Sequence, residues 1–142
     1  MIEHITYGGD LLAIIIRSSF SEPGIHFVTP LTFSQQVGYM NHPKDHTIPP
    51  HTHNDVPRDI KLTQEVLLIK SGKLRVDFYA QDHTYYLSKL LFTGDVILLS
   101  SGGHGFTMLE DTQLIEVKQG PYVGIADKNR FESVPSSRIV LE

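Results

Sequence analysis

Turn-forming residues recur along this chain at short and even intervals, and this spacing limits the folds that it can adopt. Glycine, proline, asparagine and aspartate are dense from end to end, with 11 Gly and 8 Pro among 142 residues. The segments between them are short and rich in Val, Ile, Leu, Phe and Tyr, which favours strands. No long window has the periodicity of an amphipathic helix. We therefore expect an all-β fold that forms one domain, residues 1–142.

Nine segments have the pattern of strands, and the residues between several of them predict tight turns. The Ser-Gly pair at 71–72 is typical of a hairpin, and residues 93–95 and 110–111 predict two further turns. After Pro121 the chain becomes polar, so we expect residues 121–142 to form an extended tail that packs on the domain or on a neighbour. The expected strands are Leu11–Arg17, Gly24–Val28, Gln35–Met40, Lys61–Lys70, Lys73–Ala80, Thr84–Leu91, Asp95–Leu99, Gly105–Leu109 and Gln113–Lys118.

The expected strands differ in how their apolar residues are distributed. Lys73–Ala80 alternates, which indicates one face on the core and one face toward solvent. Leu11–Ile16, Val66–Ile69 and Val96–Leu99 are apolar on both faces. Such strands lie inside a two-layer β structure or under a subunit interface, so we expect a homodimer.

Composition and charge exclude several classes of protein. The chain has no cysteine, which excludes disulfide scaffolds and thiolate metal sites, and its net charge of −4 argues against nucleic-acid or membrane partners. The longest apolar run, Leu11–Ile16, is too short to span a bilayer. The amino-terminal residues lack the pattern of a signal peptide. We expect a soluble, cytoplasmic protein whose partner is a small molecule.

Histidines are concentrated in one part of the sequence. Four of the eight lie between residues 42 and 53. His51 and His53 are two residues apart, and in a strand such residues project to the same face with Cα atoms about 6.5–7 Å apart. Two imidazoles placed in this way converge on one metal ion. His42 and His46, beside Pro43, are expected to lie in a loop.

Two further residues extend this pattern into a metal site. Glu65 opens an apolar segment, where a carboxylate is costly to bury unless it is paired or binds a cation. His104 stands after two glycines at the start of another expected strand. Three imidazoles and one carboxylate suit Fe, Mn, Co, Ni or Zn. The sequence therefore predicts one divalent transition metal bound by His51, His53, Glu65 and His104.

The order of these residues resembles the two motifs of the cupin superfamily. The first motif has two histidines separated by one residue, then a glutamate and, after six residues, a glycine. The second begins with a Gly-Asp turn and an apolar strand and ends in a histidine. The resemblance implies a single-domain cupin, a double-stranded β-helix or jelly-roll barrel, with both motifs between about residues 48 and 108. The matching residues are His51, His53, Glu65 and Gly72, then Gly94-Asp95-Val96-Ile97-Leu98-Leu99, Gly102 and His104.

Two features of the chain depart from the usual cupin motifs, and two short strings resemble one group of cupin proteins. Eleven residues, 54–64, separate His53 from Glu65, where cupins usually have three or four, and Met108 stands where asparagine is usual. The strings Gly102–Phe106 and Glu116–Tyr122 resemble small cupin-fold metalloproteins encoded near bacterial surface-polysaccharide genes.

A metal with this ligand set leaves one or two coordination positions open, which allows three functions. As a Lewis acid it supports isomerase or epimerase chemistry on a small oxygenated substrate, sugar-like or a hydroxy-carbonyl compound. With iron, the same ligands suit a dioxygenase. A non-catalytic cupin that binds or senses a small ligand is the third alternative. We expect an enzyme, and the sequence does not choose the metal.

Three charged residues are candidates for a catalytic role. Glu116 and Lys118 share one face of the last expected strand, where they are either a general base with its electrostatic partner or ordinary surface charges. Arg58 belongs to the 54–64 insertion, which is either a solvated loop or a lid whose arginine meets an anionic substrate.

Overall fold

The chain folds into strands and two short 3₁₀ helices, and it has no α-helix. The computed structural model describes residues 1–142 and contains ten strands, which confirms the all-β prediction. No helix has the length and apolar character needed to cross a membrane. The chain forms two compact units. The main unit comprises Met1–Phe20 and Leu62–Glu142, and the inserted unit comprises Ser21–Lys61.

A five-stranded antiparallel sheet forms one layer of the main unit. Its strand order is β1-β2-β8-β5-β10, so strands far apart in the sequence become neighbours. The strand β5 pairs with β8 on one side and with β10 on the other. The bounds are Ile2–Tyr7 for β1, Asp10–Ile16 for β2, Glu65–Ser71 for β5, Val96–Leu99 for β8 and Gln113–Lys118 for β10.

A three-stranded antiparallel sheet forms the second layer, in the order β7-β6-β9. In β6, Leu74, Val76 and Phe78 join the core, while the intervening residues face the other side of the sheet. The three strands are Lys73–Tyr79 for β6, Tyr85–Phe92 for β7 and Gly103–Met108 for β9.

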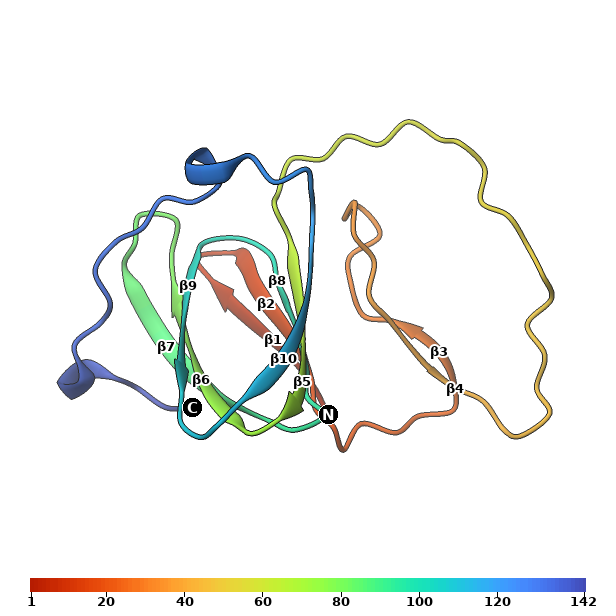
Figure 1. The fold of residues 1–142 in the computed structure, drawn as a ribbon, viewed down its shortest axis with the longest axis horizontal. Coiled ribbons are helices and arrows are strands. Elements are labelled where there is room, and N and C mark those ends of the chain that lie inside the picture. Colours follow the sequence, from red (N-terminus) through yellow and green to blue (C-terminus); the bar gives the residue numbers. More distant parts are fainter. The chain divides into compact units, whose positions relative to one another are not determined.

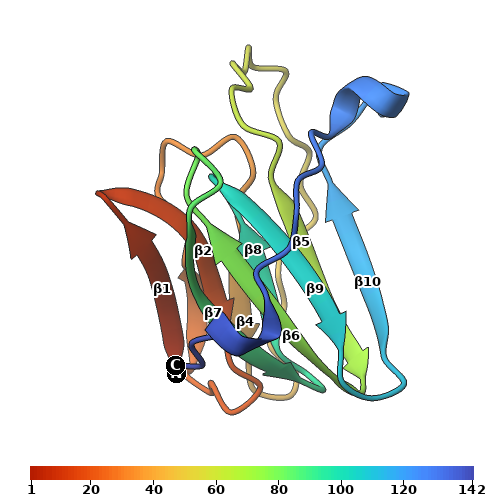
Figure 2. The same ribbon diagram turned by 90° about the vertical axis from the view of Figure 1, so that its left-hand side faces the viewer.

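The two sheets pack against each other around one apolar core (Figures 1 and 2). Ile15, Leu67 and Ile97 contribute from the five-stranded sheet, and Val76 and Leu91 from the three-stranded sheet. All five are at most 2% exposed, so the core is dry at its centre. Burial of aliphatic side chains at about 25 cal/mol per Å² is the main force that holds the layers together.

The observed strands correct three details of the sequence prediction. The first strand, β1, was not expected, while β4 and β5 begin later than predicted. The turn at 71–72 is not a hairpin, because β5 and β6 belong to different sheets. Gly72 (φ 88°) lets the chain cross between the layers, and a Cβ there would lie 2.4 Å from the carbonyl oxygen of Asp111.

The inserted unit contains one β-hairpin. Its strands are β3, Gly24–Phe27, and β4, Gly38–Asn41, paired in an antiparallel ladder. Residues 42–61 have neither strand nor helix, as expected for His42 and His46. The rings of these two histidines stack with their centroids 4.0 Å apart.

The carboxyl-terminal residues pack on the main unit. Residues 121–134, here called the strap, include the 3₁₀ helix η1, Gly124–Asp127. A second 3₁₀ helix, η2 at Ser136–Arg138, follows, and Leu141 then forms a parallel bridge to Ser88 of β7. Figures 1 and 2 show the strap passing along the outside of the three-stranded sheet.

Candidate functional site

Glu65 and His104 meet between the two sheets of the main unit. Glu65 is the first residue of β5 and lies on the same face as the core residues Leu67 and Ile69, so its carboxylate points inward. His104 is the second residue of β9, and its Nε2 lies 3.1 Å from Oε2 of Glu65. The structure therefore brings together two of the four expected metal ligands, one from each sheet.

The surroundings of Glu65 favour its charged form. The hydrogen bond with His104 is the largest influence and lowers the pKa of Glu65, and the nearby charges of Lys128 and Lys118 lower it further. Burial opposes these effects, since Glu65 is only 6% exposed, but the pKa remains below its ordinary value of 4.5. At neutral pH the site holds a carboxylate, which is the form that binds cations.

A pocket of about 440 Å³ opens at this point. Its wall includes Glu65, the beginning of β9 from Gly103 to Phe106, and the strap residues 127–131. The ring of Phe106 lies 5.3 Å from the ring of His104. The volume falls within the range of about 300–1,000 Å³ typical of small-molecule sites.

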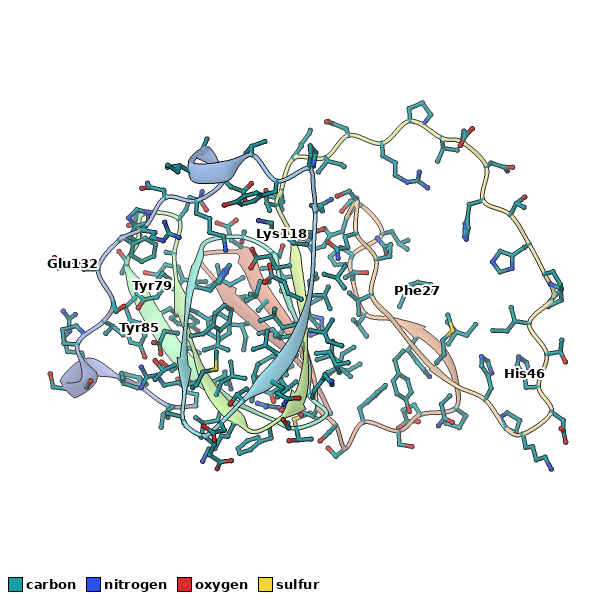
Figure 3. The ribbon with its side chains drawn as sticks, viewed as in Figure 1. Phe27, His46, Tyr79, Tyr85, Lys118 and Glu132 are labelled. Atoms are coloured by element: carbon teal, nitrogen blue, oxygen red, sulfur yellow. The ribbon has the colours of Figure 1, made fainter.

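Aromatic contacts hold the strap at the rim of the pocket. The ring of Phe131 stacks on His83 at 4.0 Å and meets Tyr79 edge-on at 5.0 Å. A Cβ at Gly103 would lie 2.8 Å from the Phe131 ring, so the absence of a side chain there makes room for it. The backbone N–H of Val134 donates to the hydroxyl of Tyr79 at 3.0 Å. In Figure 3, Tyr79 lies beside Tyr85 while Glu132 points away from the two sheets.

The candidate catalytic residues of β10 lie on its inner face. Glu116 and Lys118 alternate with Ile115 and Val117 and share the face of Leu114, which packs against the core. Lys118, labelled in Figure 3, is the register partner of Glu65 and forms an ion pair with Asp127 of the strap. Asp127 raises the pKa of Lys118. Glu116 is exposed, and neither Glu116 nor Lys118 lines the pocket.

The other candidates belong to the inserted unit. His51 and His53 are exposed, their ring centroids are 5.2 Å apart, and Nδ1 of His51 lies 3.0 Å from the carbonyl oxygen of Pro49. The strand geometry expected for them is not formed, since residues 48–53 have no regular structure. Pro49 and Pro50 account for the missing strand, because they lack the N–H groups that pair with a neighbouring strand. Arg58 donates to the carbonyl oxygen of Val56 at 3.4 Å.

The expected metal ligands thus form two pairs, Glu65 with His104 and His51 with His53, in separate units. No group of three or more His, Cys, Asp or Glu side chains within reach of a single ion is present in the described chain.

Sequence reasoning did not identify the strap as part of a pocket. Asp127, Lys128, Arg130 and Phe131 all line it, although they are about 60 residues from Glu65 in the sequence. The one available signal was the group of charged residues after Pro121, a pattern that solvated tails share.

Comparisons with family models, with curated proteins and with solved structures give no match to this chain.

Proposed function

We propose that this chain is a metal-binding cupin, a jelly-roll protein in which His51, His53, Glu65 and His104 bind one divalent transition metal. The observation that carries the proposal is the contact between Glu65 and His104 across the two sheets, at the wall of a pocket. The sequence supplies the other two imidazoles in the order expected for the cupin motifs.

The chemistry of the Glu65–His104 pair supports this proposal. A half-buried imidazole and a buried carboxylate with a lowered pKa are the donor types that Fe, Mn, Co, Ni and Zn accept. The carboxylate has one strong partner, His104, and a weaker one, Lys128 at 3.8 Å. A cation at this position would bind the carboxylate oxygens of Glu65 in place of His104 and Lys128.

We further propose that the protein is an enzyme that acts on a small oxygenated substrate. A bound metal of this type supplies Lewis-acid chemistry, which suits isomerisation or epimerisation of a sugar-like or hydroxy-carbonyl compound. The pocket has the volume for such a substrate, and Phe106 and Phe131 contribute apolar rings to its wall. Lys118 pairs with Asp127 and so positions the strap. Glu116, the one carboxylate of β10, is the candidate general base on that strand.

One observation favours the non-catalytic alternative. Glu116 is exposed and does not line the pocket, and the two carboxylates that do line it, Glu65 and Asp127, already have partners. If no acid or base acts beside the metal, the protein is a cupin that binds a small ligand. Iron as the resident metal would instead point to a dioxygenase.

Metal analysis of untagged protein, purified without chelators, tests the proposal. We expect near-stoichiometric metal in the parent protein and its loss in the Glu65→Gln, His104→Gln and combined His51→Ala/His53→Ala variants. His4→Gln is the matched control, because His4 is exposed on β1. Circular dichroism confirms that each variant is folded. A parent protein that binds none of Fe, Mn, Co, Ni or Zn after reconstitution overturns the proposal.

The identity of the metal then selects the activity assay. Iron calls for oxygen-uptake measurements, and zinc, nickel, cobalt or manganese for isomerase and epimerase screens. Loss of turnover in Glu116→Gln with unchanged metal content would support the enzyme over the non-catalytic binder.

A further inference from the structure

The pocket of the main unit is lined by two cations that its carboxylates do not pair closely. Its lining includes the cations Lys128 and Arg130, the imidazole of His104, and the two carboxylates of Glu65 and Asp127. The formal charges of the two cations and the two carboxylates balance, whereas the chain as a whole has a net charge of −4, so the pocket is less negative than the chain as a whole.

The carboxylates are already engaged by other groups. Asp127 is paired with Lys118, which does not line the pocket, and both side chains are largely buried, at 10% and 16% exposed. Glu65 accepts from His104, and its contact with Lys128 is long, at 3.8 Å. The charge of Asp127 is therefore met by Lys118, and neither carboxylate forms a close ion pair with the cations of the strap.

Arg130 is the cation without a partner. It lines the pocket, it is exposed, and it forms no ion pair within the chain. A guanidinium group presents a planar array of donors that matches a carboxylate or a phosphate. Lys128 is two residues away on the same strap, with half of its side chain exposed. Together they present donors and no acceptor to a ligand that enters the pocket.

The rest of the wall suits a ligand that is compact and hydroxylated. Tyr79, Phe106 and Phe131 offer ring surfaces, and Asn129, Thr63 and Ser133 offer neutral hydrogen-bonding groups. Sites for small polar molecules combine apolar rings with a few convergent polar groups in this way. At about 440 Å³ the pocket has room for a molecule of monosaccharide size.

We propose that this pocket binds a small hydroxylated organic anion, whose acidic group pairs with Arg130 and Lys128. The inference rests on the proposed function in taking this pocket as the ligand site of the protein. An anion that engages Lys128 also weakens the contact between Lys128 and Glu65. Ligand binding therefore frees the Glu65 carboxylate for a metal, and the two events are expected to support each other.

Titration with a matched pair of probes tests the charge requirement. D-glucuronate and D-glucuronamide differ in the acidic group alone, and D-glucose 6-phosphate tests whether a phosphate serves in place of a carboxylate. Binding is followed in ¹H–¹⁵N spectra of labelled protein, where the amides of Gly102, Gly103 and Gly105 in the pocket wall report occupancy. We expect saturable shifts with at least one anion and much weaker binding of the amide.

Arg130→Gln is the decisive variant, and Arg138→Gln is its control. Arg138 is exposed in η2 and does not line the pocket, so the same chemical change there leaves binding unaltered. Removing Arg130 is expected to weaken anion binding about tenfold or more, the usual effect of losing a hydrogen bond to a charged group. Both arginines are on the surface, and neither change threatens the fold.

The titration is run on metal-free protein and again with equimolar Zn²⁺, which separates this inference from the metal proposal. Anion binding that depends on Arg130 in protein that takes up no Zn²⁺ supports the inference independently of the metal site, which the reconstitution with all five metals tests. Zn²⁺ uptake without saturable binding of either anion overturns the inference alone. Equal affinity for glucuronate and glucuronamide, or no effect of Arg130→Gln, also overturns it.

Discussion

Two buried carboxylates of the main unit, Asp95 and Glu65, differ in how completely they are bonded. Asp95 is 2% exposed, and its oxygens accept from the backbone of Ser18 at 2.8 Å, from Arg17 at 2.9 Å and from the backbone of Phe92 at 3.1 Å. Glu65 is 6% exposed and has one short partner, His104, and one long one, Lys128.

The surroundings of Asp95 are also more fully bonded than those of Glu65. Arg17 also donates to Glu3 and to the carbonyl oxygen of Leu90, and Lys89 pairs with Glu3, so the group around Asp95 forms a closed network. Glu65 instead faces a pocket. A saturated buried carboxylate stabilises the fold, and an unsaturated one beside a cavity is available to a ligand. Asp95 thus has the bonding of a structural group, whereas Glu65 keeps the capacity to accept further donors.

Equivalent amide substitutions at the two positions give the largest expected difference. In Asp95→Asn, one side-chain oxygen becomes an NH₂ group that faces N–H donors in either orientation, and Arg17 loses one of its two charge partners. We expect a loss of about 2–4 kcal/mol in the free energy of unfolding. Glu65→Gln retains an acceptor for His104 beside open space, so we expect less than about 1 kcal/mol.

Urea unfolding at pH 7 measures both values, and Asp10→Asn, at an exposed position that begins β2, gives the background of a surface change. Equal losses for Asp95→Asn and Glu65→Gln would show that the degree of hydrogen bonding does not separate the two carboxylates.

The second prediction concerns the strap, which covers the Glu65 site but has no counterpart at Asp95. Phe131→Ala removes the ring contacts with His83 and Tyr79, each worth about 0.5–1.5 kcal/mol. We expect faster cleavage by trypsin after Lys128 and Arg130, with at most about 2 kcal/mol lost from global stability. Limited proteolysis followed by mass spectrometry locates the cuts.

Phe92→Ala serves as the control for Phe131→Ala. Phe92 is 46% exposed at the far end of β7 and contacts Lys73 rather than the strap. If cleavage after Lys128 and Arg130 is unchanged in Phe131→Ala, the ring does not hold the strap in place.

The smallest expected effect is a pH dependence in the network around Asp95. Burial alone raises the pKa of Glu3, but hydrogen bonds from Arg17 and Lys89 outweigh it, and the net pKa lies below the ordinary value of 4.5. A lowered pKa in the folded state adds stability above the pKa of the unfolded chain, and this stability is lost as pH falls through the folded value. Glu3→Gln should therefore flatten the loss of stability below about pH 5. Parallel curves for parent and variant between pH 7 and pH 3 would contradict this account.

The strand pattern was predictable to a large extent because it is local. Alternation and turn residues identified β2, β3, β6, β7, β8 and β10 to within a residue or two at each end. The strand β1 was missed because Ile2–Tyr7 mixes polar and apolar residues, and its pairing with β2 supplies the order that its own composition lacks. Local pattern also could not show that residues 71–72 join two sheets, because a tight turn looks the same in either case.

For the candidate site, too, the residues could be predicted from the sequence but their arrangement in space could not. The sequence by itself determined the all-β class and singled out Glu65 and His104, because a carboxylate and an imidazole beside apolar strands are conspicuous chemically. Their contact at 3.1 Å, and the pocket that the strap closes around them, were decided by tertiary structure alone. The physical reason is that both depend on contacts between residues 39 positions apart in the chain, on strands of different sheets, and on a strap that follows these strands. No local preference encodes which side chains such packing will place together.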